Sequence, residues 1–459
     1  MSIFSQVFMK SIINSEYTPL INIIKPKKKC RKLRNCKKCS LISLGIFSLI
    51  SSILWITIDL TTNFQCKLSY TYPDSDTDLT LTYSTFFYYS NNYVELNERN
   101  NPSNSRILIP DTTKFDTLPP VSRYIHRVDF NGLKYNSDYD YSVNIGNFPK
   151  KKFSFKTAYK NQSNWNVLIY GDMGVNGDTT RPFITNRIRH DNIDFFIHLG
   201  DIAYNLEWFF GIVGDWYLSS MEPASAVKPY MTVAGNHEQY MNFSNYYNRF
   251  TMPYRNISNN LWYNIDKPPI KFININSESF YYSFQEPTVK NLLNFINTSL
   301  YGINRTKFPW VIVSAHRPMY CSSDNTDDCT HWKTDKVRTL LEKLFYERNV
   351  TIYMSAHEHS YERTCPLYNG KCQRNTRYNK SFNYNKLEYP IHIINGGSGN
   401  HEGNSGFITN PEVWSVIRNR AKSYGVLFAN YTYLNWTEYG ITPDKKDTEV
   451  VIDWIEIKN

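Results

Sequence analysis

The sequence predicts an α/β domain that follows a smaller all-β domain and an N-terminal transmembrane helix. Three observations predict this order. An uncharged run covers residues 39–58, segments of alternating apolar and polar residues follow it, and from about residue 164 short apolar runs alternate with helical segments. Strand-like runs that alternate with helices are typical of layered α/β architecture. At 459 residues the chain is long enough for two domains and additional segments.

The positive charge of the chain is concentrated in its first 38 residues. The whole sequence has a formal net charge of +10, from 51 Lys and Arg against 41 Asp and Glu. Residues 1–38 hold ten Lys or Arg and one Glu, a charge of +9, which leaves +1 for residues 39–459. A nearly neutral globular part lacks the basic surface that binds nucleic acids. We therefore expect no nucleic acid partner.

The uncharged run at 39–58 directly follows this basic segment. Its twenty residues are enough to span a bilayer, and the positive-inside rule places the preceding segment in the cytosol. The sequence therefore predicts a basic cytosolic tail at 1–38 and a transmembrane signal anchor at 39–58. The chain would then be a single-pass type II membrane protein whose C-terminal domain is lumenal or extracellular.

The same residues leave two alternatives to an anchor. Five serines lower the hydropathy of the run, which leaves open a cleaved signal peptide and a secreted protein. A basic nuclear-type tail is disfavoured by the adjacent apolar run. Nine Asn-x-Ser/Thr sequons follow the run and none precedes it, which is compatible with a glycoprotein outside the cytosol.

Residues 62–158 are predicted to form an all-β domain. Apolar and polar residues alternate in this segment as they do in half-buried strands. Two such stretches are residues 79–83 and 153–157. The segment 133–139 resembles the tyrosine corner of fibronectin type III sandwiches, in which the hydroxyl of Tyr139 would cap the loop. The polar stretch at residues 91–104 is predicted to be a loop within the sandwich.

The α/β domain is predicted over residues 164–459. Its apolar runs are short and rich in β-branched and aromatic residues, and several end at a small residue, which indicates buried strands. The clearest runs are residues 166–170, 195–199, 230–234, 310–313, 351–354, 424–428 and 450–454. Helical segments lie between some of them, as at residues 181–189 and 334–346.

Five short polar motifs follow five of these predicted strands. Because ligands collect at the carboxyl ends of strands in open α/β sheets, the side chains of these motifs are expected to lie together. Asp supplies anionic oxygen, His neutral nitrogen and Asn an amide oxygen, and such a set holds metal ions. The motifs are Gly171-Asp172-Met173-Gly174, Gly200-Asp201-Ile202-Ala203-Tyr204, Gly235-Asn236-His237-Glu238, Val313-Ser314-Ala315-His316 and Ala356-His357-Glu358-His359. Each motif alone is commonly a turn or a core histidine, but their joint occurrence predicts a two-ion site that clamps phosphate.

This set of motifs resembles the purple acid phosphatases, a branch of the dinuclear metallophosphoesterases. Gly174 stands where most metallophosphoesterases have a histidine, and Tyr204 stands where they have a second carboxylate or amide ligand. The resemblance covers roughly residues 62–459, in a long form similar to animal-type members, although Ala356 replaces the usual glycine. It implies a metallophosphoesterase-like catalytic domain at 164–459, with two packed mixed sheets flanked by helices, preceded by a fibronectin type III-like β-sandwich.

The resemblance also implies an activity and its cofactors. It implies an acid phosphatase that hydrolyses phosphate monoesters by attack of a hydroxide held at an Fe(III)–M(II) centre, where M is Zn, Mn or Fe. The implied ligands are Asp172, Tyr204 and His359 for Fe(III), Asn236, His316 and His357 for the divalent ion, and Asp201 as the bridge. With a phenolate and a bridging hydroxide, the site would carry about one positive charge, which favours an anionic substrate.

Three histidines are candidates for contact with the substrate. His237 follows the ligand Asn236, and the resemblance implies that it contacts phosphate and donates a proton to the leaving group. Histidine suits that role because its pKa lies near working pH. His331, downstream of the fourth motif, and His401, in a Gly-rich stretch, are weaker candidates. Arg317 is expected either to reach the phosphate or to brace its loop.

The cysteines are compatible with an oxidising compartment. Cys321 with Cys329, and Cys365 with Cys372, are close in the sequence and predict local disulfides. Cys66 is left over and is expected to be either a free thiol or an intermolecular partner.

Two other functions remain open at this point. The same scaffold would serve a phosphodiesterase or another nucleotide-processing enzyme. The chain would alternatively be a surface receptor in which the β domain binds a partner and the phosphatase fold is inert. The presence of all seven implied ligands argues against the receptor, because inert descendants usually lose some of them.

Overall fold

The computed structural model describes residues 64–459, apart from 176, 178, 283–285, 325–328, 330–331, 375–382 and 443–446. The predicted tail at 1–38 and the predicted anchor at 39–58 lie outside the described residues, and so does His331. Within the described part of the chain, no helix has both the length and the hydropathy needed to cross a membrane.

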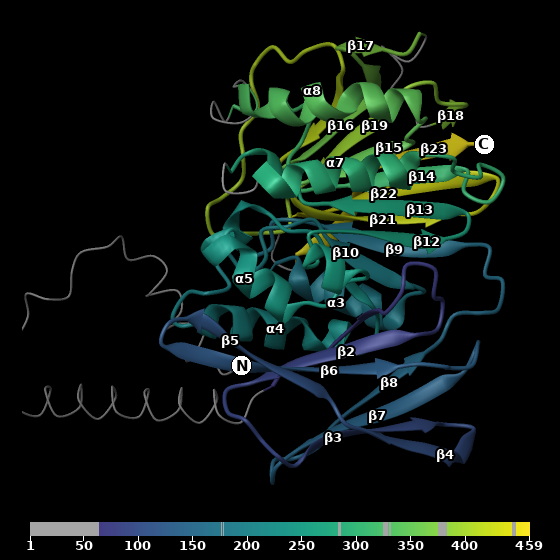
Figure 1. Cartoon of the computed structure of the whole chain (residues 1–459). Helices are drawn as coiled ribbons and strands as arrows, with labels where there is room; N and C mark the ends of the chain where they lie inside the picture. The colour runs from purple at the N-terminus through teal and green to yellow at the C-terminus, as the bar shows by residue number, and fades with distance from the viewer. Residues whose placement is uncertain are drawn as a thin grey trace, which may run out of the picture. The chain divides into compact units, whose positions relative to one another are not determined.

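The first part of the described chain forms two four-stranded antiparallel sheets (Figure 1). One sheet has the order β1 (Lys67–Tyr70), β2 (Leu79–Thr85), β6 (Val121–Phe130) and β5 (Asp111–Leu118). The other has the order β4 (Asn101–Leu108), β3 (Asn92–Glu98), β7 (Asp138–Ile145) and β8 (Lys151–Lys156). The predicted all-β character of this segment is therefore confirmed, while its exact boundaries stay a prediction.

The prediction of a loop at residues 91–104 is wrong, because most of this stretch pairs as the antiparallel strands β3 and β4. Its many asparagines favoured a loop, yet Asn92 is buried in β3. There its Oδ1 accepts a hydrogen bond from the hydroxyl of Tyr83 (2.6 Å). Val94 and Leu96 alternate with partly exposed neighbours and supply the apolar face of the strand.

The tyrosine corner is present at the predicted place. The backbone N–H of Lys134 donates to Oη of Tyr139 (3.0 Å), and the ring of Tyr139 is buried. This bond closes the turn that leads into β7. The wider likeness to fibronectin type III sandwiches stays an interpretation.

The rest of the chain is built on two mixed sheets, as predicted. The first has seven strands in the order β11 (Tyr230–Thr232), β10 (Phe195–His198), β9 (Trp165–Tyr170), β21 (Lys422–Ala429), β22 (Tyr433–Thr442), β23 (Thr448–Lys458) and β18 (Asn383–Asn385). In it, β9, β10 and β11 are parallel neighbours, whereas β21 runs antiparallel to β9.

The second sheet has eight strands. Its order is β12 (Trp262–Lys267), β13 (Ile270–Ile275), β14 (Trp310–Ser314), β15 (Ile352–Ser355), β19 (Ile391–Asn395), β16 (Tyr361–Tyr368) and β17 (Lys371–Cys372), with β20 (Ser415–Asn419) also paired to β16. The central strands β13, β14, β15 and β19 are parallel. β14 and β15 are buried along their whole length, as expected for strands covered on both faces.

Buried polar contacts join the two sheets. Trp436 of β22 donates its indole N–H to the hydroxyl of Tyr361 in β16 (3.2 Å). That hydroxyl donates to Asp453 of β23 (2.6 Å), and Arg363 of β16 pairs with the same carboxylate (2.5 Å). Both members of the ion pair are fully buried, so each charge depends on the other for compensation.

Helices cover the sheets on their outer sides (Figure 1). α3 (Arg181–His190), α4 (Ile212–Ser225) and α5 (Tyr240–Arg249) lie beside the first sheet, and α7 (Glu286–Leu300) and α8 (Trp332–Glu347) lie beside the second. Shorter helical turns are η2 (Asn236–Glu238), α6 (Arg255–Ser258) and η3 (Ser277–Phe280). The helices predicted at 181–189 and 334–346 and the seven predicted strand segments are confirmed.

Both predicted disulfides are formed, Cys321–Cys329 and Cys365–Cys372. Cys66 is a free thiol that is fully buried, so its intermolecular pairing is excluded in the folded chain. Its backbone N–H donates to the carboxylate of Glu222 in α4 (2.8 Å), which ties β1 to the α/β domain.

Candidate metal centre

The five polar motifs meet at the carboxyl ends of strands from both sheets. Asp172, Asp201 and Asn236 follow β9, β10 and β11 of the first sheet. His316 and His357 follow β14 and β15 of the second. The site therefore lies where two separate sheets present their carboxyl ends to each other, rather than along the edge of one sheet.

One group of side chains contains Asp172, Tyr204 and His359. The hydroxyl of Tyr204 lies 3.2 Å from Oδ1 of Asp172 and 2.9 Å from Nε2 of His359. The same nitrogen lies 3.6 Å from Oδ1 of Asp172. Asp172 and Tyr204 are almost fully buried. Three ligand atoms of the types that iron accepts thus converge on one point.

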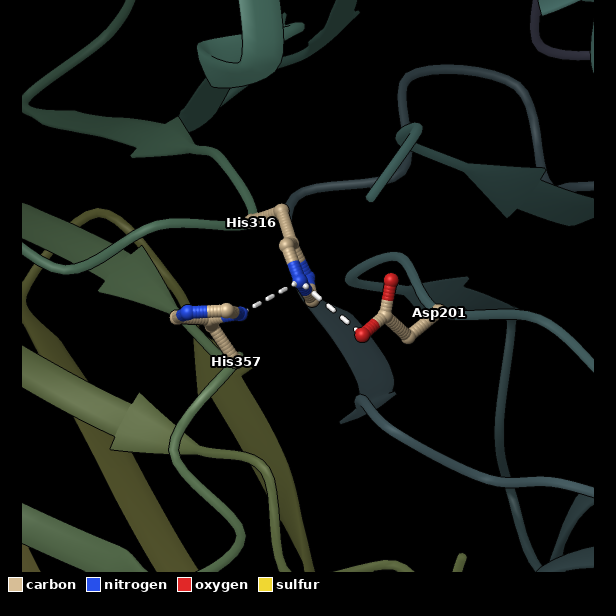
Figure 2. A group of neighbouring side chains, drawn as sticks. All are labelled: Asp201, His316 and His357. Carbon is tan, nitrogen blue, oxygen red and sulfur yellow. Dashed lines mark hydrogen bonds and ion pairs between the residues drawn. The ribbon is translucent and has the colours of Figure 1, made fainter. Parts of the chain in front are cut away.

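A second group centres on Nε2 of His316 (Figure 2). This nitrogen lies 3.3 Å from Oδ2 of Asp201 and 3.1 Å from Nδ1 of His357. It also lies 3.1 Å from Oδ1 of Asn236. Asp201, His316 and His357 have one ligand atom each within reach of a single ion. These two groups contain all seven ligands that the motifs predicted.

Hydrogen bonds behind the histidines turn their ligand atoms inward. A carbonyl oxygen only accepts, so Nδ1 of His316 donates to the carbonyl of Leu199 (2.8 Å). Nδ1 of His359 likewise donates to the carbonyl of Gly403 (2.9 Å). In each neutral ring the lone pair is then on Nε2, which faces the other candidate ligands. Such contacts fix the tautomer of metal-binding histidines.

The donor set of the second group fits a cation. Carboxylate and amide oxygens accept, imidazole nitrogens accept where they carry no proton, and two acceptors about 3 Å apart repel unless a proton or metal lies between them. Burial lowers the pKa of His316, but the carboxylates of Asp201, Asp172 and Glu278 outweigh it and raise that pKa to about 10. The site thus attracts positive charge, and a bound metal would replace this proton.

Backbone amides orient the two aspartates. The N–H of His357 donates to Oδ2 of Asp172 (2.8 Å), and the N–H of His237 donates to Oδ1 of Asp201 (2.9 Å). In each carboxylate one oxygen is held by the backbone, while the other faces the candidate ligands. The loop of the last motif therefore orients the aspartate of the first motif, and the loop of the third motif orients the aspartate of the second.

Four candidate ligands have a backbone that non-glycine residues rarely adopt. The φ angles are 58° at Asp172, 54° at Asp201, 55° at Tyr204 and 71° at His357. A non-glycine residue in the left-handed region costs on the order of 1–3 kcal/mol and is found mainly at functional sites. Packing of the surrounding sheets supports this strain, because it holds each loop immediately after a buried strand.

Two segments of the chain match known families. Residues 166–361 match the family described as Calcineurin-like phosphoesterase, and residues 389–453 match Iron/zinc purple acid phosphatase-like protein C. The chain is 34% identical over 348 residues to "Acid phosphatase type 7" of Mus musculus, a match that covers 72% of this chain and 77% of the relative. The Homo sapiens protein of the same name is 34% identical over 346 residues, with the same coverage. The chain belongs to the purple acid phosphatase family.

A solved structure agrees in fold. The purple acid phosphatase PPD1 from yellow lupin (Lupinus luteus) seeds superimposes with a TM-score of 0.71 at 23% identity, covering 86% of this chain and 74% of that chain. At this identity the likeness concerns the fold alone. The predicted family is thus confirmed, and this purple acid phosphatase is a hydrolase of the metallophosphoesterase type.

Close packing under the first motif explains why this purple acid phosphatase has two small residues there. A Cβ on Gly171 would lie 2.3 Å from Cβ of Ala356, at the start of the last motif. The loops after β9 and β15 therefore touch through backbone and a single methyl group. Ala356 in place of the usual glycine is accommodated because Gly171 has no side chain.

We expect Gly171→Ala to destabilise the fold by about 1–3 kcal/mol, because overpacking forces these loops apart. The double variant Gly171→Ala/Ala356→Gly should recover part of that loss. Recovery should be incomplete, since the new Cβ still lies 3.2 Å from the carbonyl of Asn395 and from Cβ of Leu199. The free energy of unfolding is measured by urea denaturation for the wild type, both single variants and the double variant. Equal stability of the Gly171→Ala single variant and the double variant would show that the clash is relieved elsewhere.

Glu238 holds two motifs together, a role that the sequence did not reveal. Its carboxylate accepts from the backbone N–H groups of Asp201 (2.9 Å), Ile202 (2.8 Å) and Gly235 (2.8 Å). These bonds fix the loop after β10 against the loop after β11. The only sequence signal was a Glu inside the third motif, and two of its three partners lie in the second motif.

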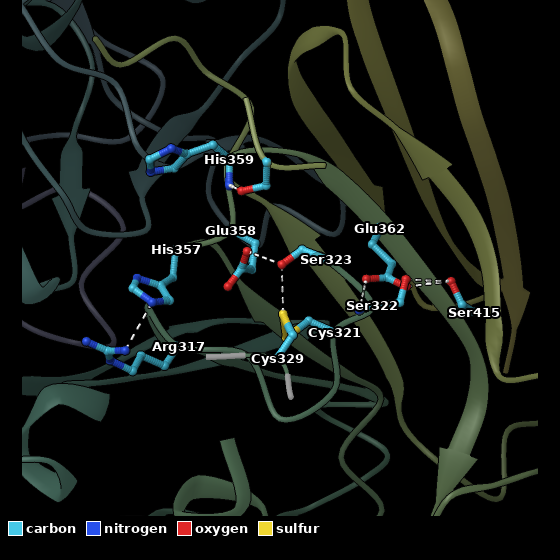
Figure 3. Close-up of a disulfide and its surroundings, with 11 residues drawn as sticks. Arg317, Cys321, Ser322, Ser323, Cys329, His357, Glu358, His359, Glu362 and Ser415 are labelled. Atoms are coloured by element: carbon cyan, nitrogen blue, oxygen red, sulfur yellow. Dashed lines mark hydrogen bonds between the residues drawn. A yellow bond between two sulfur atoms is a disulfide. The ribbon is translucent and has the colours of Figure 1, made fainter. Parts of the chain in front are cut away.

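The last motif is braced by the first disulfide (Figure 3). Ser323 donates to the carboxylate of Glu358, which lies between the ligands His357 and His359. Oγ of Ser323 is also 3.0 Å from Sγ of Cys329, and the Cys321–Cys329 disulfide closes this segment. The disulfide thus fixes a residue that contacts the last motif from behind.

His237, the predicted proton donor, lies beside both groups. Its Nδ1 donates to Oδ1 of Asn205 (3.1 Å), so Nε2 points toward the centre. That nitrogen lies 3.9 Å from Oδ2 of Asp201 and 3.5 Å from Oε1 of Glu402. The ring lies with its centroid 4.5 Å from that of Tyr204, at a tilt of 44°. Asn205 and Glu402 are further site residues that sequence reasoning missed.

The remaining candidates have different positions. His401 packs edge-on against Tyr204 (5.4 Å) and lies 6.5 Å from the ring of Trp208, so it forms part of the wall of the site. Burial lowers its pKa, as does the nearby His237. His331 lies outside the described residues.

Arg317 braces its loop. Its Nε donates to both oxygens of the buried Glu278 (2.8 and 3.0 Å), and Nη1 donates to Nε2 of His357 (3.0 Å). A guanidinium only donates, so this contact makes Nε2 of His357 an acceptor. If His357 held a metal through Nδ1, its proton would lie on Nε2, and the contact with Arg317 would be lost.

Proposed function

We propose that this chain is an acid phosphatase that hydrolyses phosphate monoesters at a pair of metal ions, Fe(III) and a divalent ion. The observation that carries this proposal is the convergence of seven acceptor side chains into two adjoining groups around His237. Membership of the purple acid phosphatase family and the names of the animal relatives support it.

The chemistry of the donors supports a division of labour between the groups. Asp172, Tyr204 and His359 suit Fe(III), because a phenol ionises readily only beside a strong Lewis acid. Burial and the charges of Asp172 and Asp201 raise the pKa of Tyr204 well above its ordinary value, which increases that need. The mostly neutral donors of Asn236, His316 and His357 suit Zn, Mn or Fe(II). Asp201 belongs to the second group and is assigned as the bridge.

Two cations bound here would neutralise the phosphoryl oxygens and activate the attacking water. The protein supplies the proton donor and the contacts that hold the site in place. His237 is held by Asn205 with Nε2 facing the centre, where it donates a proton to the departing oxygen. Tyr204 packs against the same ring and limits its rotation. Glu238 and Glu358 keep the motif loops in place.

Tyr204→Phe should remove the colour of the loaded protein, because a phenolate-to-Fe(III) absorption needs the phenolate oxygen. The ring contacts with His237 and His401 remain in this variant, so the fold should persist. Visible absorption of the iron-loaded wild type and variant measures this, with Tyr431→Phe as a control tyrosine outside the site. A purple Tyr204→Phe variant would assign the phenolate to another residue.

The experiment that tests the proposed function is hydrolysis by the metal-loaded full chain from acid to neutral pH. An aryl phosphate monoester and the matching diester are compared in the same assay. Turnover of the monoester with an acid optimum is expected. Preference for the diester would favour a phosphodiesterase, and a chain that binds no metal would favour an inert receptor.

For location, we infer a single-pass membrane protein whose catalytic domain is lumenal or extracellular, or its secreted form. The basic segment before the uncharged run supports this, and so do the two disulfides, which are typical of oxidising compartments. Protease digestion of sealed membranes tests it. Cleavage of the tail alone, with the catalytic domain protected, is expected for a lumenal domain.

A further inference from the structure

A cavity of about 610 Å³ opens beside the metal centre, on the side of His237. Asn236 and His237 form its inner wall, so it is continuous with the second group of ligands. Tyr240 and Met241 form an outer wall. Because His237 is assigned as proton donor to the departing oxygen, the organic part of a bound ester extends past this ring. The cavity lies where that part of the substrate would be.

We propose that this cavity binds the leaving group and selects aryl phosphates that have no second anionic group. The inference rests on the proposed function, since it needs phosphate at the metal centre. It goes further by naming the substrate class, an aromatic monoester with a neutral or cationic body.

Exposed aromatic and apolar side chains support the aromatic part of this inference. Tyr240 and Met241 are 39% and 44% exposed, although both line a cavity next to a polar centre. Trp208 is 38% exposed and lies 6.5 Å from the ring of His401, which in turn packs on Tyr204. A row of rings therefore runs outward from the candidate iron ligand. Aromatic substrates gain from such surfaces through stacking and burial.

Two chain segments next to the cavity have a strained backbone. Phe209 and Phe210, directly after Trp208, have φ angles of 49° and 59°, and Met241 has 48°. Large apolar residues seldom adopt the left-handed region, and strain of this kind is concentrated at ligand sites. Met241 lines the cavity, and Phe209 and Phe210 closely follow its lining residue Glu207.

Charge supports the exclusion of a second anion. Among the described residues that line the cavity there is no Lys or Arg, and Glu207 is one of them. Glu402 lies 3.5 Å from Nε2 of His237 and is 43% exposed, so its carboxylate also faces the departing group. A carboxylate or phosphate on the leaving group would meet these two acids, and no Lys or Arg among the described lining residues offsets them.

The first test measures binding without hydrolysis. Metal-loaded full chain is titrated calorimetrically with benzylphosphonate and with ethylphosphonate, which share the phosphonate and differ in the ring. Benzylphosphonate should bind at least about tenfold more tightly. Tyr240→Ala should reduce that advantage, whereas Tyr431→Ala, a tyrosine of similar exposure outside the cavity, should not.

The second test uses 4-carboxyphenyl and 4-carbamoylphenyl phosphate at neutral pH. The kcat/KM of the charged ester, 4-carboxyphenyl phosphate, should be about tenfold lower than that of the carbamoyl ester. Glu207→Gln or Glu402→Gln should reduce this difference in kcat/KM. Equal binding of the two phosphonates, or equal rates for the two esters, would overturn the leaving-group site and leave the phosphatase intact. Failure of both phosphonates to bind metal-loaded protein would instead defeat the proposed function.

Discussion

Asp201→Asn is expected to reduce monoester turnover by about 10²–10³-fold, the loss typical when a preorganised electrostatic contact to the transition state is removed. One oxygen of Asp201 accepts from the N–H of His237, and the other faces Nε2 of His316. An asparagine places its NH₂ group against one of them. Either orientation therefore breaks the backbone bond that aims the residue or presents a donor to a metal. Activity and metal content per chain are measured together.

The control is Asp194→Asn, at the opposite end of the same strand. Asp194 directly precedes β10 and accepts from the backbone N–H of Asn166 (2.8 Å) and from Gln162 (3.0 Å). Its substitution should reduce stability but leave metal content and kcat close to wild type. Normal turnover and two metals per chain in Asp201→Asn would show that Asp201 does not bridge.

The strands and the ligands could be predicted from the sequence because their signals are local. Asp172 and Asp201 each follow a short, mainly apolar run, and such a run is readable as a buried strand. What the sequence did not contain was the arrangement of the strands in space. Asp201 and His316 belong to different sheets, and their contact depends on how those sheets pack.

Residues that support the ligands were missed for the same reason. Glu238 is one polar residue among many until its carboxylate is seen to accept three backbone N–H groups, two of them from the loop of another motif. Glu402 approaches His237 across more than 160 positions of sequence. The β3 strand was missed because its asparagines favoured a loop. Val94 and Leu96 alternate with polar residues in this segment, and that alternation indicates a strand.

Asp215→Asn is expected to lower the free energy of unfolding by about 3–5 kcal/mol, more than any other substitution proposed for this chain. It leaves two buried arginines without a counter-charge. Oδ2 of Asp215, in α4, accepts from Nη2 of Arg123 in β6 (2.8 Å). Oδ1 accepts from Nη1 of Arg249 at the end of α5 (2.7 Å). The arginine side chains are 2% and 0% exposed, so water cannot replace the carboxylate. Equilibrium urea unfolding measures the loss.

The pH dependence of the variant gives a second check. Burial raises the pKa of Asp215, but Arg249 and Arg123 outweigh it, and the folded pKa is lowered. A lowered folded pKa stabilises the protein above the unfolded pKa of about 3.9, and this stabilisation is lost as pH falls through the folded value. The difference in the free energy of unfolding between wild type and Asp215→Asn should therefore be largest at neutral pH and should shrink on strong acidification.

The same cluster should also affect the site, because the arginines hold the loop that carries Asn205. Nη2 of Arg123 donates to the carbonyl of Phe210 (3.2 Å), and Nη2 of Arg249 donates to that of Gly211 (3.0 Å). The β-sandwich thus reaches the loop behind His237 through a strand of its own. Asp140→Asn, which breaks the exposed Arg99–Asp140 pair elsewhere in the sandwich, is the matched control and should change neither stability nor activity measurably. If Asp215→Asn were as stable as that control, the buried arginines would have found another partner, and the sandwich would not support the active-site loop through this cluster.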